Sequence, residues 1–379
     1  MKVGIPKESL QGEKRVALVP NVVPMLSRLG LDVVVESGAG ESAGYSDAEF
    51  QGVQAQILKT TAEVYSASDI VLKVRASEVG ETEISLMKQN HTVIGLFDPL
   101  GSPQVANLIS KTGATSFALE LVPRISRAQS MDALTSQATI TGYKSVLMAA
   151  DKLPKMFPML MTAAGTITPA KVFVIGAGVA GLQAIATANR LGAVVSGYDV
   201  RPAVKDQVES LGATFIEIEL EIVDSEEAGG YAQAMGEEFY DLQRKLLTAV
   251  VSESDVVITT AAIPGKPAPV LITTEMVKQM KSGSIIVDLA AETGGNCELT
   301  KAGEEVEEFN VSVIGPVNLA SSIPYHASQM YARNQLAFLR NMVKESSLNI
   351  DMSDQIIQES LLTKDGKVVN GRVAELLAS

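Results

Sequence analysis

The chain has 379 residues, of which 46% are hydrophobic and 20% charged, and its formal net charge at pH 7 is −13. Such a length allows two domains, each with its own core, and the composition is that of a globular protein. The negative charge argues against nucleic acid as a partner, because a phosphate backbone would be repelled. One cysteine excludes an internal disulfide, and with only two histidines we expect no bound metal. No apolar run reaches eighteen residues and the N-terminus lacks a secretion signal, which predicts a cytoplasmic protein.

The first third of the chain alternates the patterns of strands and helices. Strands are predicted at residues 2–5, 32–35, 69–74, 92–96 and 115–119. A helix is predicted over residues 21–29, with Asn21 as its N-cap and Gly30 at its end. A glycine motif at residues 38–44 is one residue too long for a dinucleotide turn, and we interpret it as a structural loop. This alternation predicts a parallel sheet with helices on both faces.

The segment from Leu121 to Gly142 is polar and follows a predicted strand end. From Ser130 onward it has a helix pattern that would lead the chain into a second domain. Ligands of α/β proteins bind at strand ends beside such crossings, so we expect its polar side chains to face a bound nucleotide. These side chains are Arg124, Arg127, Gln129, Asp132 and Thr135. The alternative is a solvated linker with ion pairs of its own.

A glycine-rich turn lies at the centre of the chain. A predicted apolar strand at residues 172–175 is followed by Gly176, Gly178 and Gly181 in G-x-G-x-x-G register. In such a turn the first glycine permits a tight bend and the second lets the backbone approach a pyrophosphate. The third lets the following helix pack closely on the strand. The spacing therefore predicts a dinucleotide-binding site.

The helix after this turn is predicted over residues 182–191 and ends at Gly192. Its first N–H groups have no partner within the helix and can bind an anion. Asp199 ends the next predicted strand, where a carboxylate can accept both ribose hydroxyls of an adenosine. A 2′-phosphate would be repelled there, so the motif predicts NAD(H). The order of strand, turn, helix, strand and acid favours this interpretation over a simple packing turn.

The following residues continue a second sheet. Strands are predicted at residues 214–218, 255–260, 284–289 and 311–314. Residues 217–241 hold nine acidic residues and no basic one, with a glycine pair ending at Gly230 beside Tyr231. This composition is typical of a solvated loop, but a glycine hinge beside an aromatic ring is also how a closing lid is built. Residues 259–269 follow a strand end and are expected to form the far wall of the nucleotide crevice.

The C-terminal part is predicted to hold a long helix from Ala332, a helix over residues 354–362 and a hairpin turn at 364–367. A break near residues 318–324 indicates that this tail returns to the first domain. We therefore predict an α/β fold of two Rossmann-like domains with parallel sheets and a nucleotide cleft between them. The predicted domains are residues 1–133 with 319–379, and residues 134–318.

Five stretches closely resemble the NAD(H)-binding component of proton-translocating nicotinamide nucleotide transhydrogenases. They are RISRAQSMD at 124–132, MTAAGTITPAKVFVIGAGVAGLQAIATANRLGA at 161–193, AGGYAQAMGEEF, TTAAIPGKPAPVLIT and LAAETGGNC. The resemblance covers essentially the whole chain. It implies the separate first portion of the alpha subunit of an AB-specific enzyme that works only with its partners. It further implies NAD(H) on this chain, NADP(H) on a partner subunit, a homodimer, and membrane-spanning proton-channel subunits that attach the chain to the cytoplasmic membrane.

The resemblance also implies roles for individual residues. Arg124, Gln129 and Asp132 would position the nicotinamide, and Tyr231 would close the site. The residues implied to bind NAD(H) are Arg124, Ile125, Ser126, Arg127, Gln129, Asp132, Thr135, Gly176, Ala177, Gly178, Val179, Ala180, Gly181, Asp199, Val200, Arg201, Gly230, Tyr231, Gln243 and Ala262. Thr135 stands where relatives often carry serine, and either hydroxyl could bond the carboxamide.

Direct hydride transfer between two nicotinamide rings releases no substrate proton, so it needs no general acid or base. It needs two rings held with their C4 atoms about 3 to 3.5 Å apart, and water excluded. The sequence has one complete dinucleotide motif, so the second nucleotide is expected on another chain.

The competing interpretation is an alanine dehydrogenase, whose fold and N-terminal pattern are similar. Arg15 and Lys73 stand where that family holds a substrate carboxylate and a catalytic lysine. Its histidine falls near residues 95–98, where no histidine occurs, and reduction of a keto acid needs a proton donor. We therefore expect Arg15 and Lys73 to form structural ion pairs or contacts inside the first domain. A third hypothesis is a non-catalytic NAD-binding module.

Overall fold

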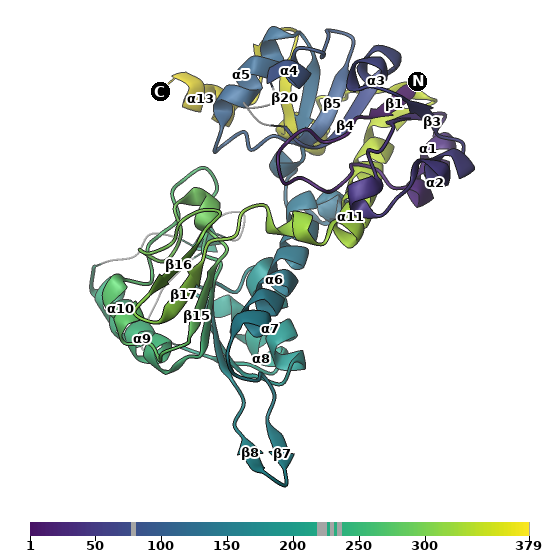
Figure 1. Cartoon of the computed structure of the whole chain (residues 1–379). Coiled ribbons are helices and arrows are strands. Elements are labelled where there is room, and N and C mark those ends of the chain that lie inside the picture. Colours follow the sequence, from purple (N-terminus) through teal and green to yellow (C-terminus); the bar gives the residue numbers. More distant parts are fainter. Residues whose placement is uncertain (77–80, 218–225, 228–230, 233–236, 379) are drawn as a thin grey trace. The chain divides into compact units, whose positions relative to one another are not determined.

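The computed structural model describes residues 1–76, 81–217, 226–227, 231–232 and 237–378. The chain forms two compact units (Figure 1). Unit 1 comprises residues 1–137 and 320–379, and unit 2 comprises residues 138–319. The chain passes from unit 1 to unit 2 within helix α6 (Ala133–Lys152) and returns within the 3₁₀ helix η8 (Leu319–Ser322).

Unit 1 is built on a sheet that has eight strands among its described residues, in the order β21-β20-β6-β5-β4-β1-β2-β3. The strands are β1 (Lys2–Ile5), β2 (Asp32–Glu36), β3 (Gln56–Leu58), β4 (Ile70–Arg75), β5 (Thr92–Leu96), β6 (Thr115–Ala118), β20 (Leu361–Lys364) and β21 (Lys367–Val368). The first six are parallel, and the last two join antiparallel at the β6 edge. The order reverses between β1 and β4, so this unit is doubly wound.

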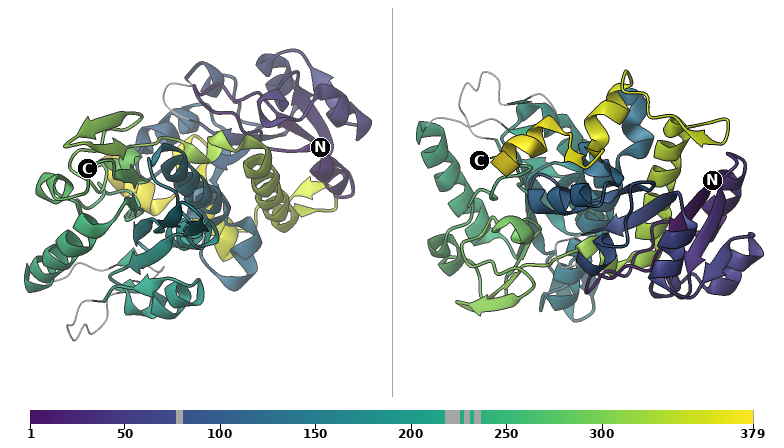
Figure 2. Two further views of the ribbon diagram at one scale, coloured as in Figure 1. Left: turned by 60° about the horizontal axis from the view of Figure 1, so that its bottom comes forward. Right: turned by 90° about the horizontal axis from the view of Figure 1, so that it is seen from above.

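Helices cover both faces of this sheet. They are α1 (Val23–Ser27), α2 (Asp47–Gly52), α3 (Thr61–Ala67), α4 (Glu81–Ile84), α5 (Pro103–Lys111), α11 (Pro324–Met342), α12 (Gln355–Ser360) and α13 (Gly371–Ala378). On β4, the side chains of Ile70, Leu72 and Val74 pack in one core with Phe338 of α11. Val71 lies in the core on the other face, to which α5 and α13 contribute. The yellow helix α13 lies beside the blue helix α5 in Figure 2.

Unit 2 repeats this plan with a seven-stranded sheet among its described residues, in the order β11-β10-β9-β14-β15-β17-β16. The strands are β9 (Lys171–Ile175), β10 (Val194–Tyr198), β11 (Thr214–Phe215), β14 (Val256–Thr259), β15 (Ile285–Asp288), β16 (Glu305–Glu308) and β17 (Val311–Ile314). All neighbouring pairs are parallel except β16 with β17. Two separate hairpins pair β7 (Leu160–Thr162) with β8 (Gly165–Ile167), and β12 (Glu226–Glu227) with β13 (Tyr231–Ala232).

The helices of unit 2 also lie on both faces. They are the second part of α6, α7 (Val179–Arg190), α8 (Lys205–Ser210), α9 (Glu237–Glu253) and α10 (Thr274–Lys278). Val172 and Val174 of β9 pack with α6 and α7, whereas Phe173 and Ile175 pack with α9 and α10. Both faces of β9 are therefore buried, which explains its continuous apolar sequence.

The predicted α/β class and the parallel sheets are confirmed, and the predicted strands lie within two or three residues of the observed ones. The hairpin turn at 364–367 is also confirmed, with left-handed Asp365 and Gly366 at its centre. The Asn21 cap is wrong: Pro20 begins a 3₁₀ turn over Pro20–Val22, so Asn21 lies inside that turn and caps nothing. No described helix combines the length and apolarity that would let it cross a membrane.

Candidate functional site

The predicted dinucleotide turn lies at the carboxyl end of β9. This strand pairs in parallel with β10 on one side and β14 on the other, so the order reverses at β9. Ligands of doubly wound sheets bind at such a reversal. Gly176 follows β9 with a φ of +97°, a conformation that residues with a side chain rarely adopt. The Thr260 hydroxyl, which follows β14, donates to the Gly176 carbonyl at 3.0 Å and ties the two strand ends together.

The other two glycines have the space that their predicted roles require. A Cβ on Gly181 would lie 1.8 Å from the Gly176 carbonyl oxygen, so only glycine lets α7 approach the turn this closely. Gly178 is the N-cap of α7, and a Cβ added there would meet nothing within 4 Å. The turn is therefore closed on its inner side and open at Gly178. This open position beside a helix N-terminus fits the pyrophosphate of a dinucleotide.

Asp199 follows β10 directly and holds the turn from the neighbouring strand. Its Oδ2 accepts from the Ala177 N–H at 2.7 Å and from Arg201 Nη2 at 2.9 Å. Its Oδ1 accepts from the Arg201 N–H and Nε, each at 2.9 Å. Each carboxylate oxygen thus has two partners. To accept a ribose hydroxyl, Asp199 must replace part of its contact with Arg201.

The remaining predicted residues of unit 2 differ in exposure. Val179 and Ala180 open α7 after Gly178, and Val200 packs partly against the core beneath. Ala262 is exposed in the loop that follows β14. Gln243 on α9 is 5% exposed, and its amide donates to the Tyr198 hydroxyl at 2.9 Å. Gln243 therefore contacts Tyr198, the last residue of β10.

The polar segment before α6 belongs to unit 1. Ser126 to Met131 form the 3₁₀ helix η5, on which Ser126 and Gln129 are exposed; Arg124 before it is exposed and Ile125 half-buried. Arg127 pairs with Asp354, the N-cap of α12, and this partner holds the pKa of the Asp354 carboxyl well below its ordinary value.

Asp132 begins helix α6 and fixes Thr135. Its carboxylate accepts from the Thr135 N–H at 2.8 Å and from the Thr135 hydroxyl at 2.6 Å. This bond pattern is that of an N-cap, which anchors the first turn of the helix. The Thr135 hydroxyl therefore offers its oxygen, not its proton, to any further ligand.

The predicted lid lies mostly outside the described residues, and Gly230 is among those not described. Tyr231 begins the two-residue strand β13, which pairs antiparallel with β12. The lid function of this segment stays a prediction.

The two residues that mark an alanine dehydrogenase site are paired within unit 1, as predicted. Lys73 Nζ lies 2.6 Å from Glu83 Oε1 and 3.2 Å from Glu8 Oε2. Burial alone would lower the pKa of Lys73, but these two carboxylates outweigh it and hold that pKa above its ordinary value. Arg15 donates from Nε and Nη2 to the two oxygens of Glu13, at 2.8 and 2.7 Å. Both cations are thus neutralised by the chain itself.

Sequence reasoning missed three polar residues that are held inside the fold, of which Glu120 is half-buried and Asp288 and Asn296 are fully buried. Glu120 follows β6, and its Oε1 accepts from the N–H groups of Phe97 and Asp98. Asp288 ends β15, and Asn296 lies in the loop beyond it; both are 0% exposed. The position of Asp288 at the end of a predicted strand was a usable signal. The partners of Asn296 lie up to 35 residues away in the sequence and give no local signal.

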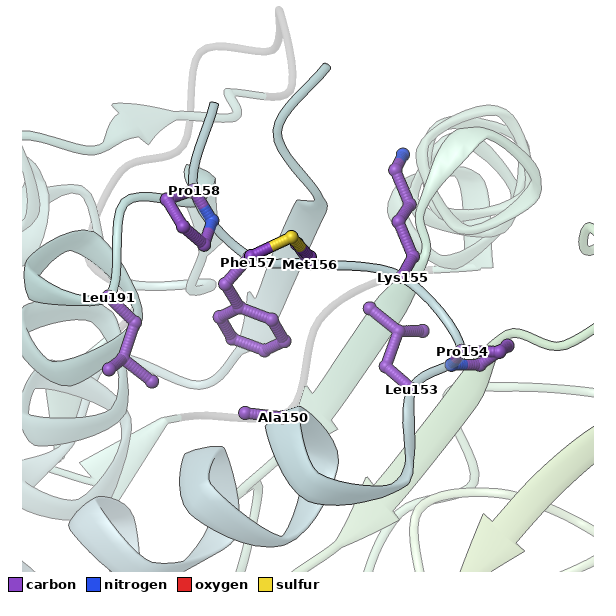
Figure 3. A pocket seen from close by; sticks show the side chains of 8 residues that line it. All are labelled: Ala150, Leu153, Pro154, Lys155, Met156, Phe157, Pro158 and Leu191. Atoms are coloured by element: carbon purple, nitrogen blue, oxygen red, sulfur yellow. The ribbon is translucent and has the colours of Figure 1, made fainter. Parts of the chain in front are cut away.

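Figure 3 shows a pocket in unit 2. It is lined by Ala150, Leu153, Pro154, Lys155, Met156, Phe157, Pro158 and Leu191. Leu191 is at the C-terminal end of α7, whereas Gly178 caps its start. Because a helix of this length spans about 18 Å, the pocket is at the opposite end of α7 from the dinucleotide turn. It is apolar apart from Lys155 and does not belong to the candidate nucleotide site.

Together these features define an α/β protein with two doubly wound units and a Rossmann dinucleotide turn in the second. Two family models match the chain: "Alanine dehydrogenase/PNT, N-terminal domain" over residues 4–141 and "Alanine dehydrogenase/PNT, C-terminal domain" over residues 145–371. The chain belongs to this alanine dehydrogenase/PNT family.

Relatives from both branches of the family are similar over the full length. The chain is 46% identical to the first portion of the NAD(P) transhydrogenase alpha subunit of Rhodospirillum rubrum, over 98% of each chain. The crystal structure of transhydrogenase from Sinorhizobium meliloti matches with a TM-score of 0.85 at 43% identity, over 98% of this chain and 99% of that one. Alanine dehydrogenase of Mycolicibacterium smegmatis is 28% identical, over 99% of this chain and 96% of that protein. The predicted resemblance to transhydrogenases is confirmed, with alanine dehydrogenase as the more distant relative.

Proposed function

We propose that the chain is the NAD(H)-binding component of a proton-translocating transhydrogenase, in which a hydride passes directly between NAD(H) held here and NADP(H) held on a partner subunit. The observation that carries this proposal is the dinucleotide turn, with an open Gly178 and with Asp199 at the end of the neighbouring strand. The similarity to NAD(P) transhydrogenase alpha chains supports the choice of reaction. In this proposal the NAD(H)-binding domain is residues 134–318.

In this proposal the residues of the chain bind and orient. The N–H groups at the start of α7 hold the pyrophosphate, and Asp199 selects a free 2′-hydroxyl. Arg124, Gln129 and Asp132 position the nicotinamide, and Tyr231 helps to exclude water. Bound NAD(H) supplies the ring carbon that takes up or gives the hydride. Because no substrate proton is released, the chain needs no general acid or base.

Exposure of the positioning residues supports these roles. Arg124 and Gln129 have exposed side chains that a ligand can reach, whereas Asp132 is held in place by Thr135. A fixed carboxylate beside exposed polar side chains suits the orientation of a ring whose reactive carbon must meet a second ring at about 3 to 3.5 Å.

The partners follow from the same proposal. The NADP(H)-binding subunit and the membrane-spanning proton-channel subunits supply the second nucleotide and the proton path, and they attach the chain to the cytoplasmic face of the inner membrane. A homodimer is supported by the β7–β8 hairpin, because residues 161–168 are all exposed. On it Met161 is 75% exposed and Ile167 40% exposed. Apolar side chains gathered on a projecting hairpin favour an interface with a second copy.

Oxidation of alanine is the less favoured reaction. It would need the cations at Arg15 and Lys73 for a substrate carboxylate and for catalysis, but Glu13, Glu8 and Glu83 already pair with them. The raised pKa of Lys73 keeps this amine protonated at neutral pH, so it is a poor base.

The test combines the purified chain with an NADP(H)-binding transhydrogenase component. NADPH and an NAD analogue with its own absorption band are added, and reduction of the analogue is followed. We expect reduction only when both proteins are present. The chain alone is also assayed for NADH formation from alanine and NAD. Alanine-dependent NADH formation, together with no transfer in the mixture, would contradict the proposal.

A further inference from the structure

The wall of the candidate nucleotide site is a loop with little structure of its own. Residues 260–269 follow β14, and those from Ala262 to Pro267 are all exposed. The first residue of the loop, Thr260, contacts the dinucleotide turn through its bond to the Gly176 carbonyl. Any shift of the loop at residue 261 therefore moves both Thr260 and the exposed Ala262.

One buried side chain joins the two ends of this loop. The Asn296 amide oxygen accepts from the Ala261 N–H at 3.0 Å, and its NH₂ group donates to the Ala261 carbonyl and to the Pro269 carbonyl, each at 2.8 Å. Asn296 thus satisfies both backbone groups of residue 261 and clamps the start and the end of the loop. Only an amide provides the one acceptor and two donors that this arrangement uses.

A second buried side chain fixes Asn296. Asp288 Oδ2 accepts from the N–H groups of Asn296 and Cys297, at 2.6 and 3.0 Å, and from the Thr300 hydroxyl at 2.6 Å. Its Oδ1 accepts from the Thr259 hydroxyl at 2.9 Å, which belongs to the strand that leads into the loop. The end of β15 is therefore linked to the end of β14 through one carboxylate. Hydrogen bonds to a carboxylate are stronger than those between neutral groups, so the backbone that carries Asn296 is held rigidly.

We propose that Asn296, oriented by Asp288, is the positioning residue for the wall of the NAD(H) site. Asn296 is 0% exposed and acts through the backbone of Ala261 and Pro269, which sets the place of the loop beside the Gly176 turn. The inference rests on the proposed function, because it assigns the role toward NAD(H) at that site. It predicts that nucleotide affinity depends on the donors of a side chain that the nucleotide never touches.

The test uses Asn296→Asp, which keeps the shape and replaces the two N–H donors with an oxygen. When charged, that carboxylate faces the carbonyls of Ala261 and Pro269 and repels them; when protonated, it again donates one hydrogen bond. Burial beside two carbonyl oxygens raises the pKa of a carboxyl. We therefore expect the Kd for NADH to rise at least about tenfold at pH 8.5, because two carbonyls lose their buried donor, and to recover toward wild type at pH 6. The wild-type Kd is measured at both pH values for comparison.

The matched control is Asn370→Asp in unit 1. Asn370 is 8% exposed, donates to the Glu359 carbonyl at 2.9 Å and accepts from the Val373 N–H. Asn370→Asp also loses an amide donor to a backbone carbonyl, so it reports the effect of a general loss of stability. The Kd of this control for NADH should stay within about twofold of wild type. Circular dichroism verifies folding of both variants. If Asn296→Asp unfolds at pH 8.5, Asn296→Ser, which cannot bridge three backbone groups, replaces it at pH 7.

The outcomes are distinct. A folded Asn296 variant that binds NADH as tightly as wild type at every pH overturns the positioning role and leaves the proposed function intact. Equal weakening in the Asn296 and Asn370 variants also overturns it. Failure of the wild-type chain to bind NADH overturns the proposed function, and the positioning role with it.

Discussion

The glycine turn yields a pair of substitutions with opposite expected effects. At Gly181 an added Cβ would lie 1.8 Å from the Gly176 carbonyl oxygen, and a backbone atom cannot rotate away as a side chain can. Such overpacking costs about 1 to 3 kcal/mol or more, so Gly181→Ala should lower the free energy of unfolding by at least about 1 kcal/mol. At Gly178 φ is −75° and the added Cβ meets nothing within 4 Å, so alanine fits the folded chain.

The stability of Gly178→Ala should therefore stay close to wild type. Alanine restricts the unfolded chain, which adds about 0.4 to 1 kcal/mol, but it is a poorer N-cap than glycine by a similar amount. Its methyl group would occupy the space through which a pyrophosphate approaches the backbone. We expect the Kd for NADH to rise at least about tenfold, which corresponds to about 1.4 kcal/mol.

The assay combines urea unfolding with calorimetric titration of NADH for both variants. Wild-type stability with weakened binding is expected for Gly178→Ala, and lowered stability for Gly181→Ala. If Gly178→Ala binds NADH like the wild type, the nucleotide does not approach the backbone here and the predicted binding site is refuted.

Four further predictions follow from the described contacts. Burial raises the pKa of Glu120 to about 7, so the folded state holds a proton that the unfolded chain has released above its ordinary pKa near 4.5. The Glu120 side chain therefore contributes to the free energy of unfolding at low pH, and this contribution, up to about 3 kcal/mol, is lost as pH rises through about 7. In unfolding titrations between pH 5 and 8, Glu120→Gln should show a smaller decline in stability than the wild type. Asp199→Ala loses its bond to the Ala177 N–H as well as its acceptor for a ribose hydroxyl, and calorimetry should show NADH binding weakened more than NADPH binding. Arg124→Ala should slow hydride transfer at least about tenfold while changing the Kd for NADH less than about threefold. Equal losses in the transfer rate and in NADH affinity would argue against a positioning role, and so would the same effect in the exposed control Arg372→Ala. Met161→Asp should shift the chain toward monomers in analytical ultracentrifugation, and an unchanged sedimentation coefficient would argue against a hairpin interface.

The dinucleotide turn could be predicted because its determinants are local. The strand at β9 is an apolar run, and the three glycines and Asp199 follow within 24 residues of its end. Each glycine has the conformation or the space that its position in the motif requires. Local spacing failed at Asn21, because Pro20 starts the turn one residue earlier and its fixed φ decides where the helical conformation begins.

Other elements depend on contacts that the sequence does not display. The strand β16, with sequence EVEE, is acidic and was not predicted, because an exposed edge strand needs few apolar residues. The β7–β8 hairpin lacks the short turn signals that mark most hairpins. The pairing of Arg127 with Asp354, 227 residues away, likewise follows only from the fold.

The candidate site also has features that could be predicted from the sequence and one that could not. Its glycine turn and its acid were found from the sequence, but the clamp of Asn296 on Ala261 was not, because it joins loops 35 residues apart. A sequence motif shows which backbone segment can bind a ligand. The hydrogen bonds that hold this segment in place come from residues far away in the sequence.

The central claim is direct transfer between two nucleotides on different chains. The most direct measurement uses NADPH that carries deuterium at the transferred position of C4, mixed with this chain, NAD and the NADP(H)-binding component, and analyses the NADH by mass spectrometry. Direct transfer predicts that nearly every NADH molecule carries the deuterium. NADH that forms with hydrogen from solvent, or that forms without the partner component, would contradict the account.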